Sequence, residues 1–502
     1  MSGAVAPAPA SCHPVAFDRV EGFGESHPWR LPDKRWPCSA AARLDLDEPV
    51  SSDSPFLDRA ALGEVLSRTQ SRVGFGLSDE TRRAIEQDAC FVIAGQQPGL
   101  LLGPAYVLYK AAAAIQLARR LSRQMNRRVL PAFWVASEDH RLEPLLHGSV
   151  FGRTLKLPAP DAPTPAMAFS LEPHRERIES WLGRLPGGAA QHRLGELFKG
   201  SYDRTLTEHF AVALGRLFVE QGLVLIDPLD LQELSRPVLL AATEKWSGLR
   251  EDLQAGTEAV QNAGLRPPIE KLSVFSINGG HRESIDPARA QKAPGLSPGV
   301  ALRPLVQDAV VPTVATVAGP TETVYLWQID RLYERMNIRR SAVTPRLSVT
   351  VLDGRAARQA AEAGLEGEKV FSVRDAVAES QEQAAVEDPA LNEALHRLVE
   401  RIENHRDDSN RKVLDKALKS IRYQVQRVQD RLRRDASAEK SLEELTERVY
   451  PARKPQERLP GTAAELYGIG GRAWLEDLLK KTDVLKPVHW LMVLGRERKD
   501  GA

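Results

Sequence analysis

This chain of 502 residues has few cysteines and almost no net charge. Its three cysteines, Cys12, Cys38 and Cys90, are far apart and form no C-x-x-C pattern, which argues against a disulfide framework and a thiolate zinc site. Such scarcity fits a reducing cytoplasm. The net charge of +1 provides no global field that would favour nucleic acid or an acidic membrane surface.

Long apolar runs are also missing, and we do not expect a secretory leader. The best membrane-span candidate, residues 98–118, contains Lys110 and Gln116, and therefore predicts a buried helix. The first 14 residues are small and Pro-rich, with no basic region and no apolar core, so we expect a flexible tail over 1–14. We predict a cytoplasmic globular protein that binds neither nucleic acid nor membranes, and the ordinary hydrophobic content of 42% agrees.

Apolar runs and amphipathic stretches alternate along residues 15–370 and predict an α/β core. Buried strands are expected at 90–95, 128–137, 222–228, 310–319 and 341–353. Helices are expected near 57–70, 105–125, 321–336 and 355–364. Strand–helix–strand units of this length are typical of a parallel sheet. We therefore predict a doubly wound open sheet with insertions over 150–220 and near 260–300.

Residues 371–450 have a different composition, poor in Gly and Pro and dense in charged side chains. Apolar residues recur there four and three apart, at Leu391, Leu395, Leu398, Ile402, Leu414, Leu418, Ile421, Val425, Val428 and Leu432. This a/d spacing predicts a coiled coil. The polar stretch 403–410 breaks the register, so an antiparallel hairpin and one long helix with a stutter both remain open. Residues 451–502 regain Gly and aromatics and should return to the core.

The loop after the first predicted strand carries a glycine at every fourth position, in "GQQPGLLLGPAYVLYK" (95–110). It matches neither G-x-G-x-x-G nor G-x-x-x-x-G-K-[ST]. Small residues before a helix allow an anion to approach free backbone N–H groups. Gln96 and Gln97 add amides, and Lys110 lies within reach of a phosphate or carboxylate. A glycine-rich turn that only packs helix against strand explains the spacing equally well.

The next predicted strand ends in "FWVASEDH" (133–140), beside the first loop in a parallel sheet. Two acids and an imidazole at this point can orient an amine, accept a proton or hold Mg²⁺ through water. A helix N-terminus would also favour Ser and acidic residues here. His140 and His147 lack an evident third ligand, so we expect no zinc site.

Two further clusters complete the pattern. In "LRPLVQDAVVPTVATVAGPTETVYLWQ" (302–328), Gly319 and Pro320 form a second strand-to-helix switch, preceded by Arg303, Gln307 and Asp308. In "TPRLSVT" (344–350), Arg346 and Ser348 follow a proline and a leucine. Each of these clusters, taken alone, is more typical of scaffold than of a site.

Taken in order, these four motifs and the helical segment resemble the bacillithiol biosynthesis cysteine-adding enzyme family (BshC). The resemblance spans nearly the whole chain beyond the N-terminal tail, and the long first and third motifs are specific. Two departures occur. Residues 135–140 read "VASEDH" where the family more often has Gly before Glu-Asp-His, and Arg141 stands where the family often has a second acid.

The resemblance implies a Rossmann-like α/β core related to nucleotidyltransferases and class I synthetases, with inserted connecting segments. It also implies a coiled coil that supports a homodimer. The implied activity is that of a ligase, which joins cysteine through an amide bond to the glucosamine amine of glucosaminyl malate. A carboxylate does not acylate an amine unaided at neutral pH, so ATP, or another nucleotide, with Mg²⁺ is the expected activator. The chain nevertheless contains no H-I-G-H-type or K-M-S-K-S-type sequence.

The resemblance and the motif positions together give the candidate site residues. Glu138, Asp139 and His140 are the catalytic candidates. The candidates for binding substrate or nucleotide are Gly95, Gln96, Gln97, Gly99, Gly103, Pro104, Tyr106, Lys110, Trp134, Ser137, Gln307, Asp308, Gly319, Pro320, Thr321, Glu322, Arg346 and Ser348.

Alternatives stay open at this point. The same loops would serve another α/β transferase acting on nucleotide sugars or phosphorylated metabolites. A coiled-coil assembly protein with a vestigial crevice is a third hypothesis, although polar clusters at successive strand ends argue against it. A nucleotide site near the helical segment is also open, because Arg422, Arg427 and Arg431 are available there, although such residues are more typical of solvated surface.

Overall fold

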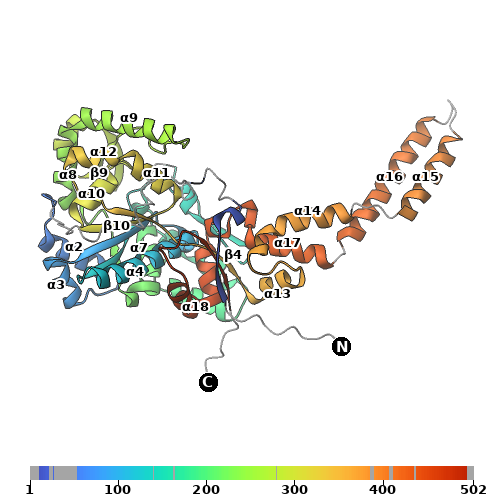
Figure 1. Ribbon diagram of the computed structural model, residues 1–502, viewed down its shortest axis with the longest axis horizontal. Helices are drawn as coiled ribbons and strands as arrows, with labels where there is room; N and C mark the ends of the chain where they lie inside the picture. The colour runs from blue at the N-terminus through green and yellow to red at the C-terminus, as the bar shows by residue number, and fades with distance from the viewer. Residues whose placement is uncertain are drawn as a thin grey trace, which may run out of the picture. The chain divides into compact units, whose positions relative to one another are not determined.

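The structure is a computed structural model that describes residues 11–21, 27, 54–139, 141–161, 164–278, 280–384, 389–405, 411–434 and 437–494 (Figure 1). The chain divides into two units. The larger comprises chiefly Cys12–Val351 and Lys454–Met492, and the smaller chiefly Leu352–Arg453. Each unit is described by itself.

A five-stranded parallel sheet forms the centre of the larger unit. Its strand order is β11-β10-β2-β3-β6, and every neighbouring pair is parallel. The strands are β2 (Cys90–Gln96), β3 (Val129–Val135), β6 (Val224–Ile226), β10 (Thr313–Ala318) and β11 (Ala342–Pro345). The chain passes between them through helices, as parallel connections require. The predicted α/β class with a parallel sheet is confirmed.

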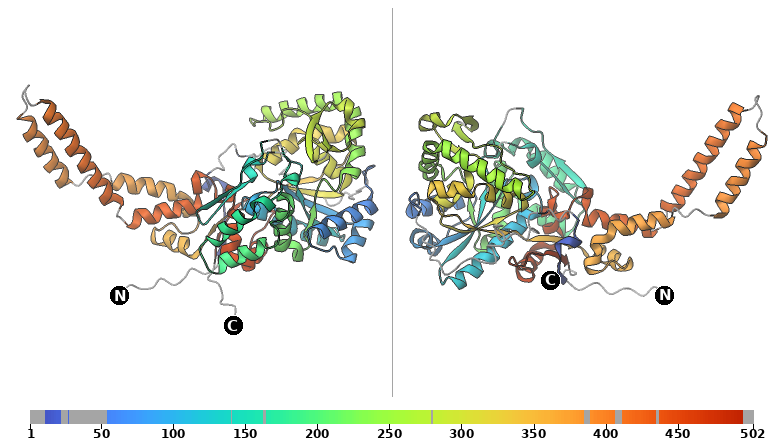
Figure 2. Two further views of the ribbon diagram at one scale, coloured as in Figure 1. Left: turned by 180° about the vertical axis from the view of Figure 1, so that it is seen from behind. Right: turned by 45° about the horizontal axis from the view of Figure 1, so that its top comes forward.

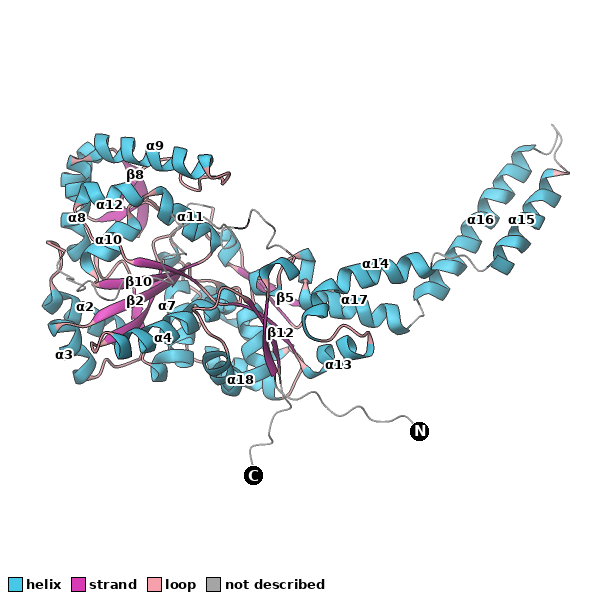
Figure 3. Cartoon of the chain, in the orientation of Figure 1, coloured by secondary structure: helices cyan, strands magenta, loops and turns pink. Residues whose placement is uncertain are grey.

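Helices cover both faces of this sheet (Figure 3). On one face lies α4 (Tyr106–Gln124), whose alanines at 111–114 are buried and let the helix approach β2 and β3 closely. On the other face, Phe91 and Ile93 join a hydrophobic core with α2 (Arg59–Arg72), α8 (Gln232–Glu244) and α10 (Arg303–Val310). Alternate residues of β2 therefore serve opposite faces.

The predicted strand over 341–353 is wrong as one element. It divides at Arg346 and Leu347 into β11 and β12 (Ser348–Leu352), which belong to different sheets. The second sheet has the order β1-β13-β12, with β1 at Ser11–Val15 and β13 at His489–Val493. β1 thus begins inside the stretch for which the sequence suggested a tail.

The remaining elements of the larger unit surround the parallel sheet. A helix precedes β2, namely α3 (Asp79–Gln87). Between β3 and β6 lie β4 (His147–Val150), β5 (Arg153–Lys156), α5 (Arg175–Gly183), α6 (Ala189–Phe198) and α7 (Leu206–Phe218). Between β6 and β10 lie α8, α9 (Trp246–Asn262), β7 (Val274–Asn278), β8 (His281–Ile285), β9 (Leu296–Pro298) and α10. The three strands form an antiparallel sheet of order β8-β7-β9.

The helix predicted from 321 to 336 is two helices, α11 (Pro320–Gln328) and α12 (Asp330–Met336). The Gln328 side chain bonds both the N–H and the C=O of Ile269 at this break, at 3.0 and 2.7 Å. Near the C-terminal end of the unit, α18 (Thr462–Lys481) packs against α4. The Gln116 amide of α4 bonds carbonyls at the end of α18, including Thr482 O at 3.0 Å. Residues far apart in the sequence therefore share this core.

The smaller unit is almost entirely helical. It contains α13 (Gly354–Glu362), α14 (Val373–Ala384), α15 (Pro389–Glu403), α16 (Arg411–Arg434) and α17 (Ser437–Val449). α14 packs against α17 and α15 packs against α16 (Figure 2). The chain therefore extends outward through α14 and α15 and returns through α16 and α17. Of the two arrangements left open by the sequence, the structure has the hairpin.

The predicted seam accounts for the burial pattern of α16. Leu418 is buried and Leu414, Ile421 and Val425 are half-buried, whereas most positions between them are exposed. Supercoiling of this hairpin, as in a true coiled coil, stays a prediction. In neither unit does a described helix combine the length and apolar character needed to cross a membrane.

Candidate functional site

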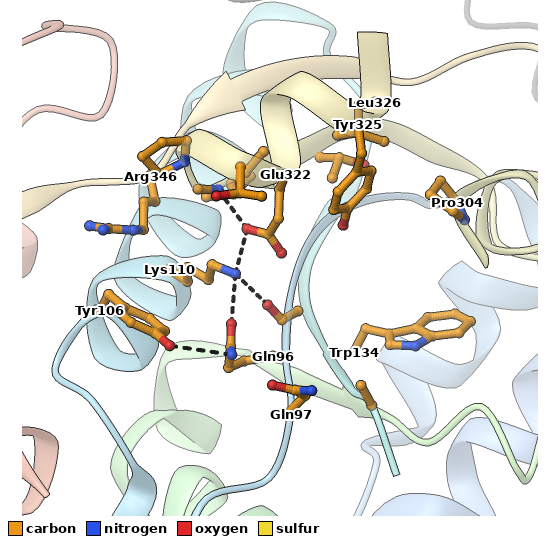
Figure 4. Close-up of a pocket in the computed structure, with 18 of the residues that line it drawn as sticks. Gln96, Gln97, Tyr106, Lys110, Trp134, Pro304, Glu322, Tyr325, Leu326 and Arg346 are labelled. Carbon is orange, nitrogen blue, oxygen red and sulfur yellow. Dashed lines mark hydrogen bonds and ion pairs between the residues drawn. The ribbon is translucent and has the colours of Figure 1, made fainter. Parts of the chain in front are cut away.

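A cavity of about 700 Å³ lies at the carboxyl ends of β2, β3 and β10 (Figure 4). Open α/β sheets bind their ligands at this edge. Of the residues predicted from the sequence, the cavity is lined by Gly95, Gln96, Gln97, Tyr106, Lys110, Trp134, Asp139, Gln307, Gly319, Pro320, Thr321, Glu322 and Arg346. The cavity therefore brings together the loop that follows β2, the end of β3 and the turn from β10 to α11.

Lys110 connects the end of β2 to the first turn of α11. Its buried Nζ lies 2.6 Å from Glu322 Oε2, and donates to Gly95 O at 2.7 Å and to Gln96 Oε1 at 3.0 Å. Burial lowers the pKa of Lys110 below its ordinary value, although the Glu322 carboxylate opposes this shift. Glu322 also accepts from the N–H of Gly319 at 2.6 Å and so caps α11. Lys110 is therefore already neutralised by a carboxylate.

Asp139 lies in the cavity wall at the end of β3. The Gln97 amide donates to its Oδ2, and the N–H of Arg141 donates to its Oδ1 at 2.9 Å. These two donors fix the orientation of the carboxylate without adding a charge. Glu322 is the other acid in the lining, and it already forms an ion pair with Lys110. Among the described residues, Asp139 is thus the cavity carboxylate that has no cationic side chain bonded to it.

Glu138 points elsewhere, into the protein behind the cavity wall. Its side chain is 1% exposed, and its Oε2 has no hydrogen-bond partner among the described residues. Burial raises the pKa of Glu138, while Arg303, Arg282 and a hydrogen bond from Ser297 oppose this rise. Arg303 begins α10 and lines the cavity, whereas the other two residues come from the antiparallel sheet.

The neighbours of this acid pair differ from expectation. Ser137 turns away from the cavity, and its Oγ donates to Asp227 Oδ1 at 2.5 Å, beyond the end of β6. Burial raises the pKa of Asp227 to about 6. His140 lies outside the described residues. The predicted catalytic cluster is therefore divided, with one acid in the cavity wall and one behind it.

Gln307 and Asp308 differ in their relation to the cavity, although the Gln307 amide donates to Asp308 Oδ1 at 3.1 Å. Gln307 lines the cavity and its amide donates to Thr316 Oγ1 at 3.2 Å. Asp308 is outside the lining, and its Oδ2 accepts from Tyr333 OH and from the N–H of Ser341, both at 3.0 Å. Asp308 thus fastens α12 and the start of β11 to α10, which is a structural role.

Arg346 is held by a buried carboxylate from the C-terminal part of the chain. Its two terminal nitrogens lie 3.0 and 2.6 Å from the two oxygens of Glu457, which is fully buried. Ser348 lies outside the cavity lining, and its Oγ donates to Glu457 Oε2 at 2.9 Å and lies 2.9 Å from Nδ1 of His489. The guanidinium of Arg346 stands 5.2 Å from the ring centroid of Tyr106, at the cavity wall.

The glycine-rich turn faces away from the cavity. Gly99, Gly103 and Pro104 are absent from the lining, and residues 100–102 are buried. Gly103 O accepts the N–H groups of Gly461 at 2.9 Å and Ala463 at 3.3 Å, at the start of α18. Gly103 has a φ of +68° and a ψ of −148°, a conformation essentially confined to glycine. This turn therefore holds a helix start of the same chain.

Replacing Gly103 by Ala should lower the free energy of unfolding by about 1–3 kcal/mol, because a Cβ is strained at this φ and ψ. Substrate affinity should be unchanged, since the turn does not reach the cavity. Urea denaturation and a binding titration measure the two effects. Gly76→Ala is the matched control, as no atom lies within 4 Å of its Cβ position and its φ is not in the left-handed region. A weakened substrate affinity in the folded Gly103 variant would contradict this assignment.

Several cavity residues were absent from the sequence-based set. Arg303, at the start of α10, precedes the predicted strand but is not among the predicted site residues. Tyr325 lies three residues after Glu322 on the same face of α11, a spacing that could have revealed it. Lys454 and Arg458 also line the cavity, more than 100 residues beyond the other motifs. They stand in "KPQER", which in the sequence looks like charged surface. No local pattern relates them to the sheet.

Anionic groups fit this cavity better than a protein-bound metal ion. Among the described residues, Arg303, Lys454 and Arg458 have no bonded carboxylate, and Asp139 is the carboxylate of the cavity lining that has no bonded cation. The described part of the chain contains no group of three or more His, Cys, Asp or Glu side chains placed to hold a metal. On α16, Arg422 and Arg427 are exposed, and the Arg431 side chain lies outside the described residues.

Comparisons with known proteins agree with this architecture. Residues 40–347 match the family described as "Bacillithiol biosynthesis BshC, N-terminal Rossmann-like domain". A relative from Heliobacterium modesticaldum, named "Putative cysteine ligase BshC", is 31% identical and the alignment covers 92% of this chain and 93% of its own. Relatives of the same name come from Solibacter usitatus (29% identical, 75% and 79% covered) and Thermus thermophilus (32%, 57% and 61%). The matched region contains every strand of the parallel sheet.

Proposed function

Because this chain belongs to the bacillithiol biosynthesis BshC family, we propose that it is a ligase that joins cysteine to the glucosamine amine of glucosaminyl malate through an amide bond. One observation carries the proposal. A single cavity combines a fixed carboxylate, Asp139, with cations that have no bonded carboxylate within the described part of the chain, Arg303, Lys454 and Arg458. An amine acceptor that carries carboxylates needs both features.

The size of the cavity supports two small substrates. Its volume of about 700 Å³ falls within the ordinary range for small-molecule sites. A sugar with a dicarboxylate substituent and one amino acid fit such a volume together. Trp134, Tyr106 and Tyr325 contribute aromatic rings to the wall. Apolar surface of this kind excludes water, which strengthens the polar contacts that remain.

Asp139 is the residue we assign to the amine. An ammonium group has no free electron pair, so the sugar amine must lose a proton before it attacks a carbonyl carbon. Asp139 can hold the ammonium and accept that proton, and Gln97 keeps the carboxylate in place. Lys110 and Glu322 neutralise each other, so they serve to position the β2 loop and α11.

The cysteine carboxylate needs activation at neutral pH, and ATP with Mg²⁺ would supply it. The cations of the cavity fit a polyphosphate as well as a carboxylate, with Arg303, Lys454 and Arg458 as the residues that would hold it. A positively charged wall stabilises the negative charge that develops on the acyl oxygens during the reaction.

Mass spectrometry tests the proposed activity. The purified protein is incubated with glucosaminyl malate, cysteine, ATP and Mg²⁺, and each component is omitted in turn. A new thiol carrying one cysteine residue, formed only in the complete mixture, would establish the ligase. A sugar product formed without cysteine would indicate a different transferase and overturn the proposal.

We also propose that the helical segment supports a homodimer. On α16, Val413 is 70% exposed and Tyr423 is 60% exposed, which is unusual for large apolar side chains. Deletion of residues 371–450 should therefore give monomeric or insoluble protein, whereas the full chain should scatter light as a dimer. A truncated protein that remains a soluble dimer would place the interface elsewhere.

A further inference from the structure

Asp227 lies next to the candidate site without lining it. It is the first residue after β6, and β6 pairs in parallel with β3, with Trp134 opposite Ile226. Because β3 lies between β6 and the other strands that border the cavity, Asp227 is outside the cavity lining. It is only 6% exposed. A buried carboxylate is costly unless it is paired and hydrogen-bonded, so its contacts indicate what it holds in place.

The carboxylate of Asp227 joins two other parts of the chain. Its Oδ1 accepts from Ser137 Oγ at 2.5 Å and from the N–H of Leu229 at 3.1 Å. Its Oδ2 accepts from the guanidinium of Arg72, in α2, at 2.8 Å. An apolar side chain could fill the same space but could not bind the Ser137 hydroxyl. Asp227 therefore connects α2 to the short segment after β3 that ends in Asp139.

Main-chain bonds hold the same segment, residues 137–139, from another direction. The C=O of Ser137 accepts from the N–H of Met167 at 3.1 Å, and the C=O of Asp139 accepts from the N–H of Ala166 at 2.9 Å. The place of the Asp139 carboxylate in the cavity wall thus depends on these bonds and on the bond from Ser137 to Asp227. A displacement of about 1 Å at a reacting group can lower a rate about 100-fold.

Asp230 distinguishes this role from one that only fastens α2. Its Oδ1 accepts from Arg72 at 2.6 Å, and its Oδ2 accepts from Thr69 Oγ1 at 2.6 Å. Both of these bonds go to α2 and neither reaches the segment after β3. Asp227 and Asp230 therefore share Arg72 as a partner, and they differ in the bond to Ser137.

We propose that Asp227 is a positioning residue for the reaction, which acts through Ser137 to hold residues 137–139 so that the Asp139 carboxylate faces the substrate amine. The proposal rests on the proposed function, because it requires Asp139 to act on that amine. Asp227 itself neither contacts the substrate nor accepts its proton. Loss of Asp227 should therefore lower kcat and leave the binding of cysteine unchanged.

Steady-state kinetics of the full chain tests this role. An amide carries a donor on one side, so Asp227→Asn cannot accept from both Ser137 and Arg72. This variant should lower kcat for thiol product about 10- to 100-fold and leave KM for cysteine within about two-fold of wild type. Ser137→Ala removes the same bond from its other end and should cause a similar loss. Asp230→Asn is the matched control, which alters the same arginine contact and should retain the wild-type kcat.

A double variant shows whether the two residues act through one bond. If they do, Asp227→Asn combined with Ser137→Ala should lose no more activity than the more impaired single variant. Losses that multiply in the double variant would overturn the proposed connection. An Asp227→Asn enzyme with the wild-type kcat, or an equal loss in Asp230→Asn, would also overturn it. If Asp227→Asn does not fold, the comparison of Ser137→Ala with Asp230→Asn still decides the matter.

Hydrogen–deuterium exchange measures the same effect without the reaction. The N–H of Ser137 donates to Val135 O at 2.7 Å, and the N–H of Asp139 donates to Ala136 O at 3.4 Å. Peptides that cover residues 133–139 should exchange faster in Asp227→Asn and in Ser137→Ala, but not in Asp230→Asn. If the wild-type chain yields no thiol product, the ligase proposal fails, and this measurement alone decides whether Asp227 holds the segment. Unchanged exchange in both variants would overturn that role.

Discussion

Asp139→Asn should reduce kcat/KM for thiol product formation by about 10²–10⁴-fold, the range typical of a lost general base. An amide cannot accept the proton that the sugar ammonium must lose, whereas the shape of the side chain is preserved. The Arg141 N–H can still donate to the amide oxygen, so the fold should persist. The product assay by mass spectrometry, run as a time course at several acceptor concentrations, gives kcat/KM for the variant and for the wild type.

Glu143→Gln provides the comparison for this variant, because Glu143 is an exposed acid in the turn that follows β3. It should retain wild-type rates. Thermal melting of both variants verifies that they remain folded. An Asp139→Asn enzyme that keeps its activity within a few-fold of wild type would exclude Asp139 as the base. His140 would then be the next candidate for that role.

The second large effect concerns stability. Glu457→Gln should lower the free energy of unfolding by about 3–5 kcal/mol, because it removes the carboxylate that pairs with the buried guanidinium of Arg346. The same carboxylate also accepts from Ser348 Oγ and from the N–H of Val349, at 2.9 and 3.2 Å. Urea denaturation monitored by tryptophan fluorescence measures the loss. Glu476→Gln removes an exposed i,i+4 pair with Lys480 and should change stability by only tenths of a kcal/mol.

The pH dependence of this effect has a definite sign. Burial alone would raise the pKa of Glu457, but the ion pair with Arg346 prevails and holds that pKa below its ordinary value. The carboxylate therefore contributes stability above its unfolded pKa, and that contribution is lost as the pH falls through the folded value. The difference between wild type and Glu457→Gln should be largest at neutral pH and should shrink on acidification. A difference that grows on acidification would contradict the ion-pair explanation.

The sequence was sufficient to find the centre of the fold and much of the candidate site. Buried strands and an Ala-rich helix have strong periodicities, so β2, α4, β3 and β10 could be located from apolar patterns alone. Parallel strands place their carboxyl ends at one edge, which brings polar clusters at those ends together. Lys110, Asp139 and Glu322 were found by this reasoning.

Other features depend on information that local patterns do not contain. Within the run over 341–353, Pro345 is the residue that marks the division between β11 and β12, but the apolar pattern continues beyond it and no Gly or Asn turn follows, so the run reads as one strand. Beyond a strand end, the direction of each side chain is set by tertiary contacts. The sequence therefore could not separate Asp139, in the cavity wall, from Glu138 behind it.

The pairing of Arg346 with Glu457 also has a consequence for the order in which the protein is made. The two residues lie 111 positions apart, so a ribosome adding about 5–20 residues per second delivers the carboxylate on the order of 5–20 s after the guanidinium. During that interval Arg346, in the wall of the cavity, does not yet have the Glu457 carboxylate as its partner. β13, the central strand of the second sheet, has not been synthesised either. The nascent chain therefore passes through a stage in which the strands of the parallel sheet have been synthesised but the site is incomplete. We expect chaperones to bind the nascent chain chiefly at that stage.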